Sequence, residues 1–127
     1  MPDTTTIHET PLVSIRLDNG ILHVRPTGPN IGQRESPILA KELEPFLKQA
    51  GKGLKHLVLD LQSVQFMSSM GLGLCIGWRN AAHGTGAQAV IFGMNKELKA
   101  LMGMMKIDKL YKVVDTPSQL RDVCGLG

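Results

Sequence analysis

The chain has 127 residues, enough for one domain with its own core, and 43% of them are hydrophobic, as in an ordinary globular protein. The formal charge of +3 is mild, and the basic residues are scattered without the interleaved aromatic side chains that a nucleic-acid groove would use. No apolar run approaches the roughly 20 residues of a membrane span, and two cysteines without a C-x-x-C pair or a secretory leader favour a cytoplasmic protein. We therefore expect neither a nucleic acid nor a membrane as a partner.

The N-terminal part predicts a tail followed by a hairpin. Residues 1–10 are polar and rich in threonine, so we expect a flexible tail, with residues 11–127 forming a single domain. Apolar stretches at 12–17 and 21–26 predict two strands. Asp18-Asn19-Gly20 between them is typical of a tight turn, because Asn and Gly tolerate positive φ angles. The two strands should therefore pair antiparallel.

A loop and a helix are predicted next. The loop at residues 27–36 holds two glycines and a proline, and Ser36 suits the N-cap of a helix that starts with Pro37. Apolar side chains at helical spacing extend this helix to Ala50. Pro45 should kink it or divide it in two, because a proline removes one backbone hydrogen bond and clashes with the preceding turn.

The most informative stretch is 57–78, LVLDLQSVQFMSSMGLGLCIGW. The apolar run at 56–61 predicts a central strand, and a polar turn and two serines, Ser68 and Ser69, follow it. From Met70 to about residue 83 the pattern predicts a helix that is apolar on nearly all sides and therefore deeply buried. The free N–H groups and positive dipole end of a helix N-terminus favour an anion, including a phosphate, beside the serines.

Three glycines, Gly71, Gly73 and Gly77, lie in this helix although glycine is a poor helix former. We expect them to allow close approach of the helix to the sheet and its neighbours. Their spacing differs from the G-x-G-x-x-G of a dinucleotide site, so close packing is the better interpretation.

The remaining chain predicts a buried strand at 87–93, an amphipathic helix at 96–105, a short extended segment at 110–114, and a last helix that ends near Val123. A hairpin followed by strand–helix–strand crossovers indicates an α/β protein. We expect a mixed sheet of four to five strands with helices packed against it.

No catalytic or metal site is predicted. Asp60 ends a predicted strand, but no His, Lys or second acid stands at a recognisable spacing from it. The four histidines are scattered without a metal-ligand pattern. We therefore expect no enzyme activity and no cofactor.

The stretch around the two serines resembles a known signature. A strand ending in Asp-Leu, followed by Phe-Met-x-Ser-x-Gly-Leu-Gly, resembles the STAS domain and, more narrowly, the bacterial anti-sigma-factor antagonists. In that family a serine that follows an Asp is phosphorylated by a partner kinase that is itself the anti-sigma factor. The matching positions are Ser69 for the phosphorylated serine, Gly71 for the glycine two residues later, and Ser68 for the Asp. The resemblance extends from about residue 11 to residue 120.

The resemblance implies an antagonist without catalytic activity that binds an anti-sigma factor with a serine-kinase fold and thereby releases a sigma factor. Phosphorylation of Ser69, with Ser68 as second choice, would dissolve the complex, and a phosphatase would restore it. In the family the loop matching residues 27–36 lies near the switch serine and helps to contact the partner. The residues expected to bind the partner are Asn30, Ile31, Gln33, Ser68, Ser69, Met70 and Leu72.

Two alternatives remain open. The chain could be a scaffold or oligomeric STAS subunit of a signalling assembly, or the stand-alone equivalent of a transporter's regulatory STAS module. It could instead bind a small ligand, or act as an enzyme, in a pocket above Asp60 and Ser69. From the residues alone, Ser68-Ser69 is also readily explained as a helix cap.

Overall fold

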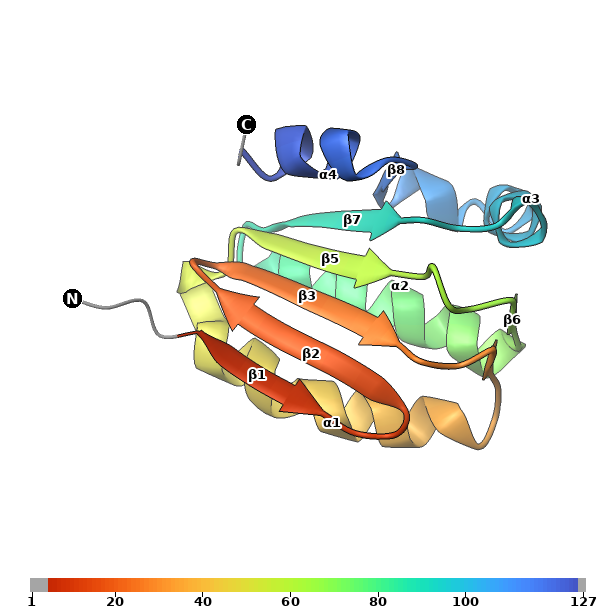
Figure 1. Ribbon diagram of the computed structural model, residues 1–127, viewed down its shortest axis with the longest axis horizontal. Helices are drawn as coiled ribbons and strands as arrows, with labels where there is room; N and C mark the ends of the chain where they lie inside the picture. Colours follow the sequence, from red (N-terminus) through yellow and green to blue (C-terminus); the bar gives the residue numbers. More distant parts are fainter. Residues whose placement is uncertain (1–4, 126–127) are drawn as a thin grey trace.

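A mixed six-stranded sheet, in the order β1-β2-β3-β5-β7-β8, forms the centre of the computed structural model, which describes residues 5–125 (Figure 1). The pairings of β1 with β2 and of β2 with β3 are antiparallel, and the others are parallel. The strands are β1 (Thr6–Glu9), β2 (Val13–Asp18), β3 (Ile21–Pro26), β5 (His56–Asp60), β7 (Gln88–Phe92) and β8 (Lys112–Val114). The predicted mixed sheet is confirmed, with more strands than the four or five expected.

Helices pack on both faces of this sheet. Figure 1 shows α1 and α2 side by side behind the sheet, and α4 on its other side beyond β7. Two separate apolar clusters follow from this arrangement, because successive side chains of a strand point to opposite faces. Leu57 and Leu59 of β5 belong to the large cluster under α1 and α2, whereas Val58 belongs to the small cluster under α4. The helices are α1 (Glu35–Ala50), α2 (Ser69–Gly84), α3 (Lys96–Met104) and α4 (Pro117–Val123), with 3-10 turns at Gly51–Gly53 and Ile107–Lys109.

The expected flexible tail at residues 1–10 is wrong for Thr6–Glu9, which form the edge strand β1. Thr6 pairs with Leu17 of β2, so the strand extends the sheet by one member. On the helix side, the His8 ring lies 5.5 Å from the ring of Phe46, centroid to centroid, and its Nε2 lies 3.2 Å from Glu42 Oε2. These contacts with α1 stabilise β1, although the polar composition of this segment had indicated a flexible tail. Residues 1–4 lie outside the described part of the chain.

The predicted hairpin is confirmed. Asp18 pairs with Ile21, which leaves Asn19 and Gly20 as a two-residue turn with φ angles of 52° and 80°. Both angles are positive, as the primed hairpin turns require, and Asn and Gly are the residues that adopt them at least cost.

Helix α1 starts two residues earlier than predicted, at Glu35, with Arg34 as N-cap. Ser36 does not cap the helix, because its Oγ is buried and donates a hydrogen bond to the carbonyl of Gly32 at 2.7 Å. Pro45 lies within one continuous helix, so the division into two pieces did not occur. Pro45 is on the exposed side, and burial of Leu43 and Phe46 outweighs the single backbone hydrogen bond that a proline removes.

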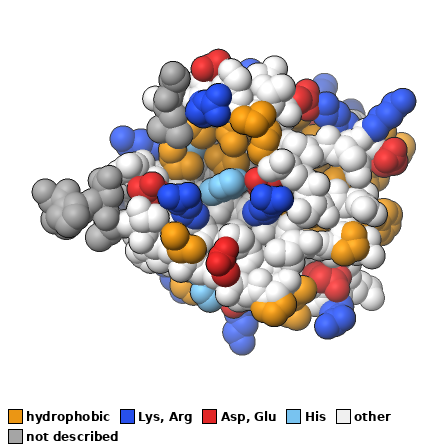
Figure 2. Space-filling model, in the orientation of Figure 1, with side chains coloured by type: hydrophobic (Ala, Val, Ile, Leu, Met, Phe, Trp, Pro, Cys, Tyr) orange, Lys and Arg blue, Asp and Glu red, His pale blue; other side chains and the backbone are white. Residues whose placement is uncertain are grey.

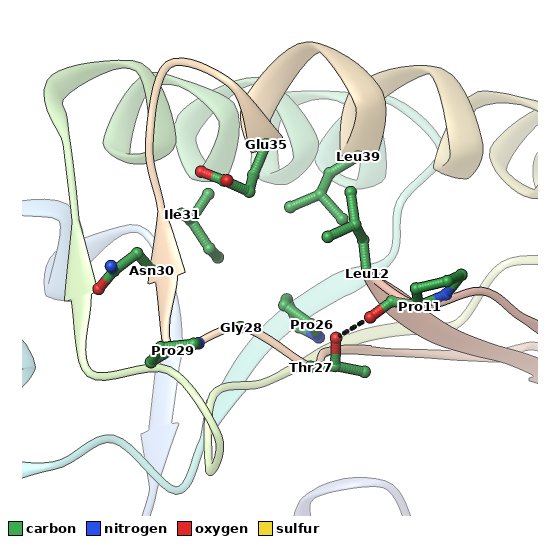
Figure 3. Close-up of a pocket in the computed structure, with 10 residues that line it drawn as sticks. All are labelled: Pro11, Leu12, Pro26, Thr27, Gly28, Pro29, Asn30, Ile31, Glu35 and Leu39. Carbon is green, nitrogen blue, oxygen red and sulfur yellow. Dashed lines mark hydrogen bonds between the residues drawn. The ribbon is translucent and has the colours of Figure 1, made fainter.

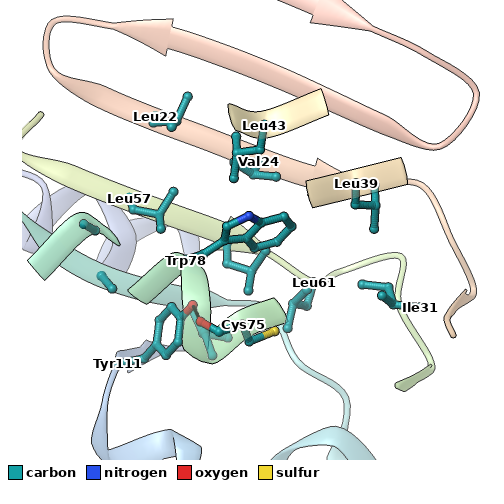
Figure 4. Close-up of a cluster of buried hydrophobic side chains, with 14 of the residues drawn as sticks. Leu22, Val24, Ile31, Leu39, Leu43, Leu57, Leu61, Cys75, Trp78 and Tyr111 are labelled. Atoms are coloured by element: carbon teal, nitrogen blue, oxygen red, sulfur yellow. Dashed lines mark hydrogen bonds between the residues drawn. The ribbon is translucent and has the colours of Figure 1, made fainter. Parts of the chain in front are cut away.

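The core between α1, α2 and the sheet is shown in Figure 4, where the Trp78 indole of α2 lies among Leu43, Val24 and Leu57. On the other side of α2, the Tyr111 hydroxyl donates a hydrogen bond to the backbone carbonyl of Cys75 at 2.5 Å. Burial raises the pKa of the Cys75 thiol to about 12, so this cysteine is an unreactive core residue at neutral pH.

Within residues 5–125, no helix combines the length and apolar character needed to cross a membrane.

Candidate functional site

The two serines lie where β6 (Phe66–Met67) leads into α2. Ser68 is the N-cap, in extended conformation, and its Oγ accepts a hydrogen bond from the backbone N–H of Gly71 at 3.4 Å. Ser69 is the first residue of the helix, and its side chain is exposed, whereas Ser68 is half-buried. The helix therefore begins one residue before the predicted Met70, and the Ser69 hydroxyl is accessible to a partner.

The N-terminus of α2 has free hydrogen-bond donors. Within the described residues, the backbone N–H groups of Ser69 and Met70 reach no acceptor, and the first turn contains no acidic side chain. Unpaired N–H groups and the positive dipole end together favour a negative group at this place. A phosphate on Ser69 would thus lie in a favourable electrostatic environment.

The loop of residues 27–36 is fixed against this helix start, as expected. Its residues Asn30–Ile31 form the short strand β4, which pairs in parallel with β6. The N–H of Ser68 donates to the carbonyl of Ile31 at 2.9 Å, and the N–H of Gln65 donates to the carbonyl of Pro29 at 2.7 Å. The loop and the two serines therefore form one continuous surface.

Gly71 makes this contact possible. A Cβ atom at Gly71 would lie 2.6 Å from the carbonyl oxygen of Ile31, closer than real Cβ contacts allow. Within residues 5–125, no atom outside the neighbouring backbone of α2 itself lies within 4 Å of a Cβ built at Gly73 or Gly77. The expectation of close packing is thus correct for Gly71 and wrong for the other two glycines.

The prediction that α2 is buried on nearly all sides is also wrong. Met70 and Ile76 are 44% and 37% exposed, and Gly73 and Gly77 lie on the same open side. The apolar residues of this helix exceed what the core can cover, so an apolar strip of α2 extends from Ser69 along the surface.

The seven residues predicted to bind a partner divide by exposure. Asn30, Gln33, Ser69 and Met70 are exposed and Ser68 is half-buried. Ile31 and Leu72 are 1% and 6% exposed, so their side chains pack into the core and we remove them from the contact surface. β6 turns Met67 inward and leaves Phe66 58% exposed, a neighbour that the sequence reasoning missed although the alternation of a strand could have indicated it.

A cavity of about 350 Å³ lies beside the loop, between it, the start of β2 and the first turns of α1 (Figure 3). Three prolines line it together with the apolar side chains of Leu12 and Leu39. The carboxylate of Glu35 also faces it, and Glu35 Oε1 accepts a hydrogen bond from the N–H of Gly32 at 2.9 Å. Neither Asp60 nor Ser69 lines this cavity, so it is not the pocket of the small-ligand alternative.

Asp60, at the end of β5, is 1% exposed and has a histidine partner that sequence spacing did not reveal. His23 lies on the neighbouring strand β3, and its Nε2 is 3.0 Å from Asp60 Oδ2. Burial raises the pKa of the Asp60 carboxyl, but hydrogen bonds from the side chains of His23 and Gln62 and from the Gln62 N–H outweigh it, so the pKa is lowered. Only the pairing register of β3 with β5 brings these groups together.

This cluster fixes the turn that leads to the serines. The N–H and the Nε2 of Gln62 donate to Asp60 Oδ1 at 3.1 and 2.9 Å. Gly93, with a φ of 79°, leaves room for Gln62, since a Cβ there would lie 2.4 Å from Gln62 Cγ. The geometry supports a structural role for Asp60 in placing β6 and the start of α2.

We expect the cap of α2 to respond to substitution of Ser68. Ser68→Ala removes the acceptor for the Gly71 N–H and should lower the free energy of unfolding by about 0.5–1 kcal/mol, a small effect because the hydrogen bond is long. Ser68→Asp keeps an acceptor and adds a negative charge at the dipole, so it should raise the free energy of unfolding by about 0.3–1 kcal/mol. Urea denaturation measures both. Equal stabilities of all three proteins would show that the cap contributes nothing.

Comparison with known proteins decides the family. The STAS domain model matches residues 13–120, which is most of the chain. The chain belongs to the STAS domain family. The family resemblance of the serine stretch is thereby confirmed, and the α/β fold described above is the fold of this family.

Among curated relatives, the chain is similar to an anti-sigma F factor antagonist of Paenibacillus polymyxa, with 25% identity over 96 residues that cover 76% of this chain and 80% of the relative. Among solved structures, a candidate anti-sigma factor antagonist from Thermotoga maritima has a TM-score of 0.73 at 15% identity, covering 85% of this chain and 90% of that one. The Bacillus cell fate determinant SpoIIAA in its phosphorylated form has a TM-score of 0.65 at 11% identity, covering 95% and 99%. The TM-scores of these two solved structures show a shared fold.

Proposed function

We propose that this STAS protein is an anti-sigma-factor antagonist that binds an anti-sigma factor with serine-kinase activity, and that phosphorylation of Ser69 releases it. The observation that carries the proposal is the position of Ser69, exposed at the first residue of α2 beside unpaired backbone N–H groups. The names of the similar proteins support the antagonist role. A phosphorylated form of a protein with the same fold supports a phosphate as the switching group.

The docking surface in this proposal is the start of α2 with the neighbouring loop. Its apolar centre is formed by Phe66 and Met70, which are 58% and 44% exposed, and its polar margin by Asn30, Gln33 and the hydroxyl of Ser69. Large exposed apolar side chains within a polar margin are typical of a protein–protein contact. Truncation of a central residue of such a contact typically costs 2 kcal/mol or more of binding free energy.

The switch acts through charge and volume. The kinase transfers the terminal phosphoryl group of ATP to Ser69 Oγ, the hydroxyl proton leaves, and ADP is released. The phosphate adds about two negative charges, which the N-terminus of α2 accommodates, so the domain stays folded. The same phosphate lies in the polar margin of the docking surface, next to Met70, and prevents the partner from closing over the apolar centre. A phosphatase reverses the change by hydrolysing the phosphoserine.

In this proposal the protein is a kinase substrate and not a catalyst, and a kinase that uses ATP places it in the bacterial cytoplasm. Ser68 in place of the family's Asp removes one negative charge beside the hydroxyl. The kinase must then recognise Ser69 without that carboxylate, and Ser68→Asp should make Ser69 a better substrate.

The test is the phosphorylation state of the protein isolated from its own cells under several growth conditions. Intact mass and peptide mapping should find a fraction with one added phosphoryl group on Ser69. A Ser69→Ala variant should remain unmodified, while Ser68→Ala should still be modified. A protein that stays unmodified under all conditions, or that carries the phosphoryl group elsewhere, would contradict the switch.

A further inference from the structure

A second cavity, of about 310 Å³, opens on the face of the sheet opposite α1 and α2, between the β2–β3 hairpin and α4. Its volume lies at the lower end of the range typical of small-molecule sites. In Figure 2, which looks onto this face, hydrophobic side chains gather beside a histidine flanked by two basic side chains. We call this cavity the α4 cleft.

The floor of the α4 cleft is apolar. Ile21 of β3, Val58 of β5, and Leu120 and Cys124 of α4 line it, and all four belong to the small apolar cluster under α4. Helix α4 has only seven residues and leaves part of this cluster open to the cleft. An occupant with an apolar body would therefore complete the burial of this cluster, which is favourable in proportion to the apolar area removed from water.

The margin of the cleft is mainly cationic. Arg16 of β2 and Arg121 of α4 line it from opposite sides, and neither forms an ion pair within residues 5–125. Guanidinium groups that are not already paired are well suited to bind a carboxylate. His23 lies opposite Arg16 in the strand pairing and is held by Asp60. The one acid of the lining, Asp18, lies at the hairpin end.

We propose that the α4 cleft binds a small carboxylic acid with an apolar chain. The carboxylate lies between Arg16 and Arg121, and the chain lies on the apolar floor. An amine would face two guanidinium groups, and a free phosphate would leave the floor uncovered. Asp18 directs the carboxylate away from the hairpin end by repulsion. The site is separate from the proposed docking surface, so ligand binding in the cleft can be tested independently of the antagonist function.

The probe is octanoate, with octylamine and octanol as ligands of matched chain length. Titration of the ¹⁵N-labelled protein should shift the amide signals of Ile21, Val58 and Cys124 with octanoate at millimolar concentration, and much less with octanol or octylamine. Arg16→Gln and Arg121→Gln should each raise the Kd of octanoate about tenfold, as expected for the loss of a charge-assisted hydrogen bond. Asp18→Asn should lower the Kd of octanoate. Arg34→Gln, at an exposed arginine before α1, should leave it unchanged.

The signal shifts of the unsubstituted protein test the site even where a variant does not fold. Absence of octanoate-induced shifts at the cleft would overturn the proposal. So would octylamine binding as tightly as octanoate, tighter amine binding that Asp18→Asn abolishes, or octanoate binding that Arg16→Gln and Arg121→Gln leave intact.

Discussion

Gly71→Ala should lower the free energy of unfolding by about 1–3 kcal/mol, the usual cost of forcing an extra carbon into a packed contact. The added Cβ would lie 2.6 Å from the Ile31 carbonyl oxygen, a backbone atom that also accepts the hydrogen bond of Ser68. The loop and the start of α2 must therefore move apart. Alanine is also the better helix former, which adds up to about 1 kcal/mol of stability. The measured change in the free energy of unfolding is therefore the cost of the steric clash minus this gain.

Gly73→Ala and Gly77→Ala are the matched controls in the same helix. Both positions are open, so only the propensity gain of about 0.5–1 kcal/mol should appear, and both variants should be more stable than the original. Urea denaturation of the three variants gives the comparison. A Gly71→Ala protein as stable as the two controls would show that the loop does not need this glycine. The variant should also weaken partner binding, because the loop and Ser69 then no longer form one surface.

Local signals in the sequence predicted most elements of this fold. The hairpin follows from Asn19-Gly20 between two apolar stretches, and β5, β7 and α3 follow from short apolar runs and helical spacing. The last helix follows from Thr116, whose side chain accepts a hydrogen bond from the N–H of Gln119 in a capping box. These are interactions between neighbours in the chain, and sequence patterns report such interactions directly.

Most of the wrong predictions depend on contacts between distant segments. β1 forms because β2 and α1 supply its partners, while its own composition is polar. Ile31 and Leu72 were expected to bind the partner, but both side chains are buried in the large cluster under α1 and α2. The family resemblance of the serine stretch indicated where to look for the candidate site, whereas the exposure of its residues required the packed structure.

Asp60→Asn should lower the free energy of unfolding at neutral pH by about 1.5–3 kcal/mol, the range for losing hydrogen bonds to a buried charged group. The carboxylate accepts from His23 Nε2, from Gln62 Nε2 and from the Gln62 N–H, and it is 1% exposed. Asparagine has the same shape but presents one N–H₂ group where an oxygen accepted. Asp122→Asn, at an exposed acid of α4, is the control and should change stability by less than about 0.5 kcal/mol.

The pH dependence separates the charge of Asp60 from its shape. Its folded-state pKa lies below the ordinary value of 3.8, so its contribution to stability is present above that value and is lost as the pH falls through the folded-state pKa. The unsubstituted protein should therefore lose more stability than Asp60→Asn between neutral pH and about pH 3. Parallel stability curves for the two proteins would mean that the charge of Asp60 contributes nothing.

A double-mutant cycle then assigns the partner. If the His23 contact carries the effect, His23→Ala and Asp60→Asn should each destabilise the protein, and the double variant should cost clearly less than their sum. His23 is half-exposed and can be hydrated when Asp60 is replaced, so the coupling energy should be smaller than the loss for Asp60→Asn alone. Additive losses would leave Gln62 as the partner that matters. In that case the buried carboxylate acts mainly by fixing the turn before β6, which is also the turn that places Ser69.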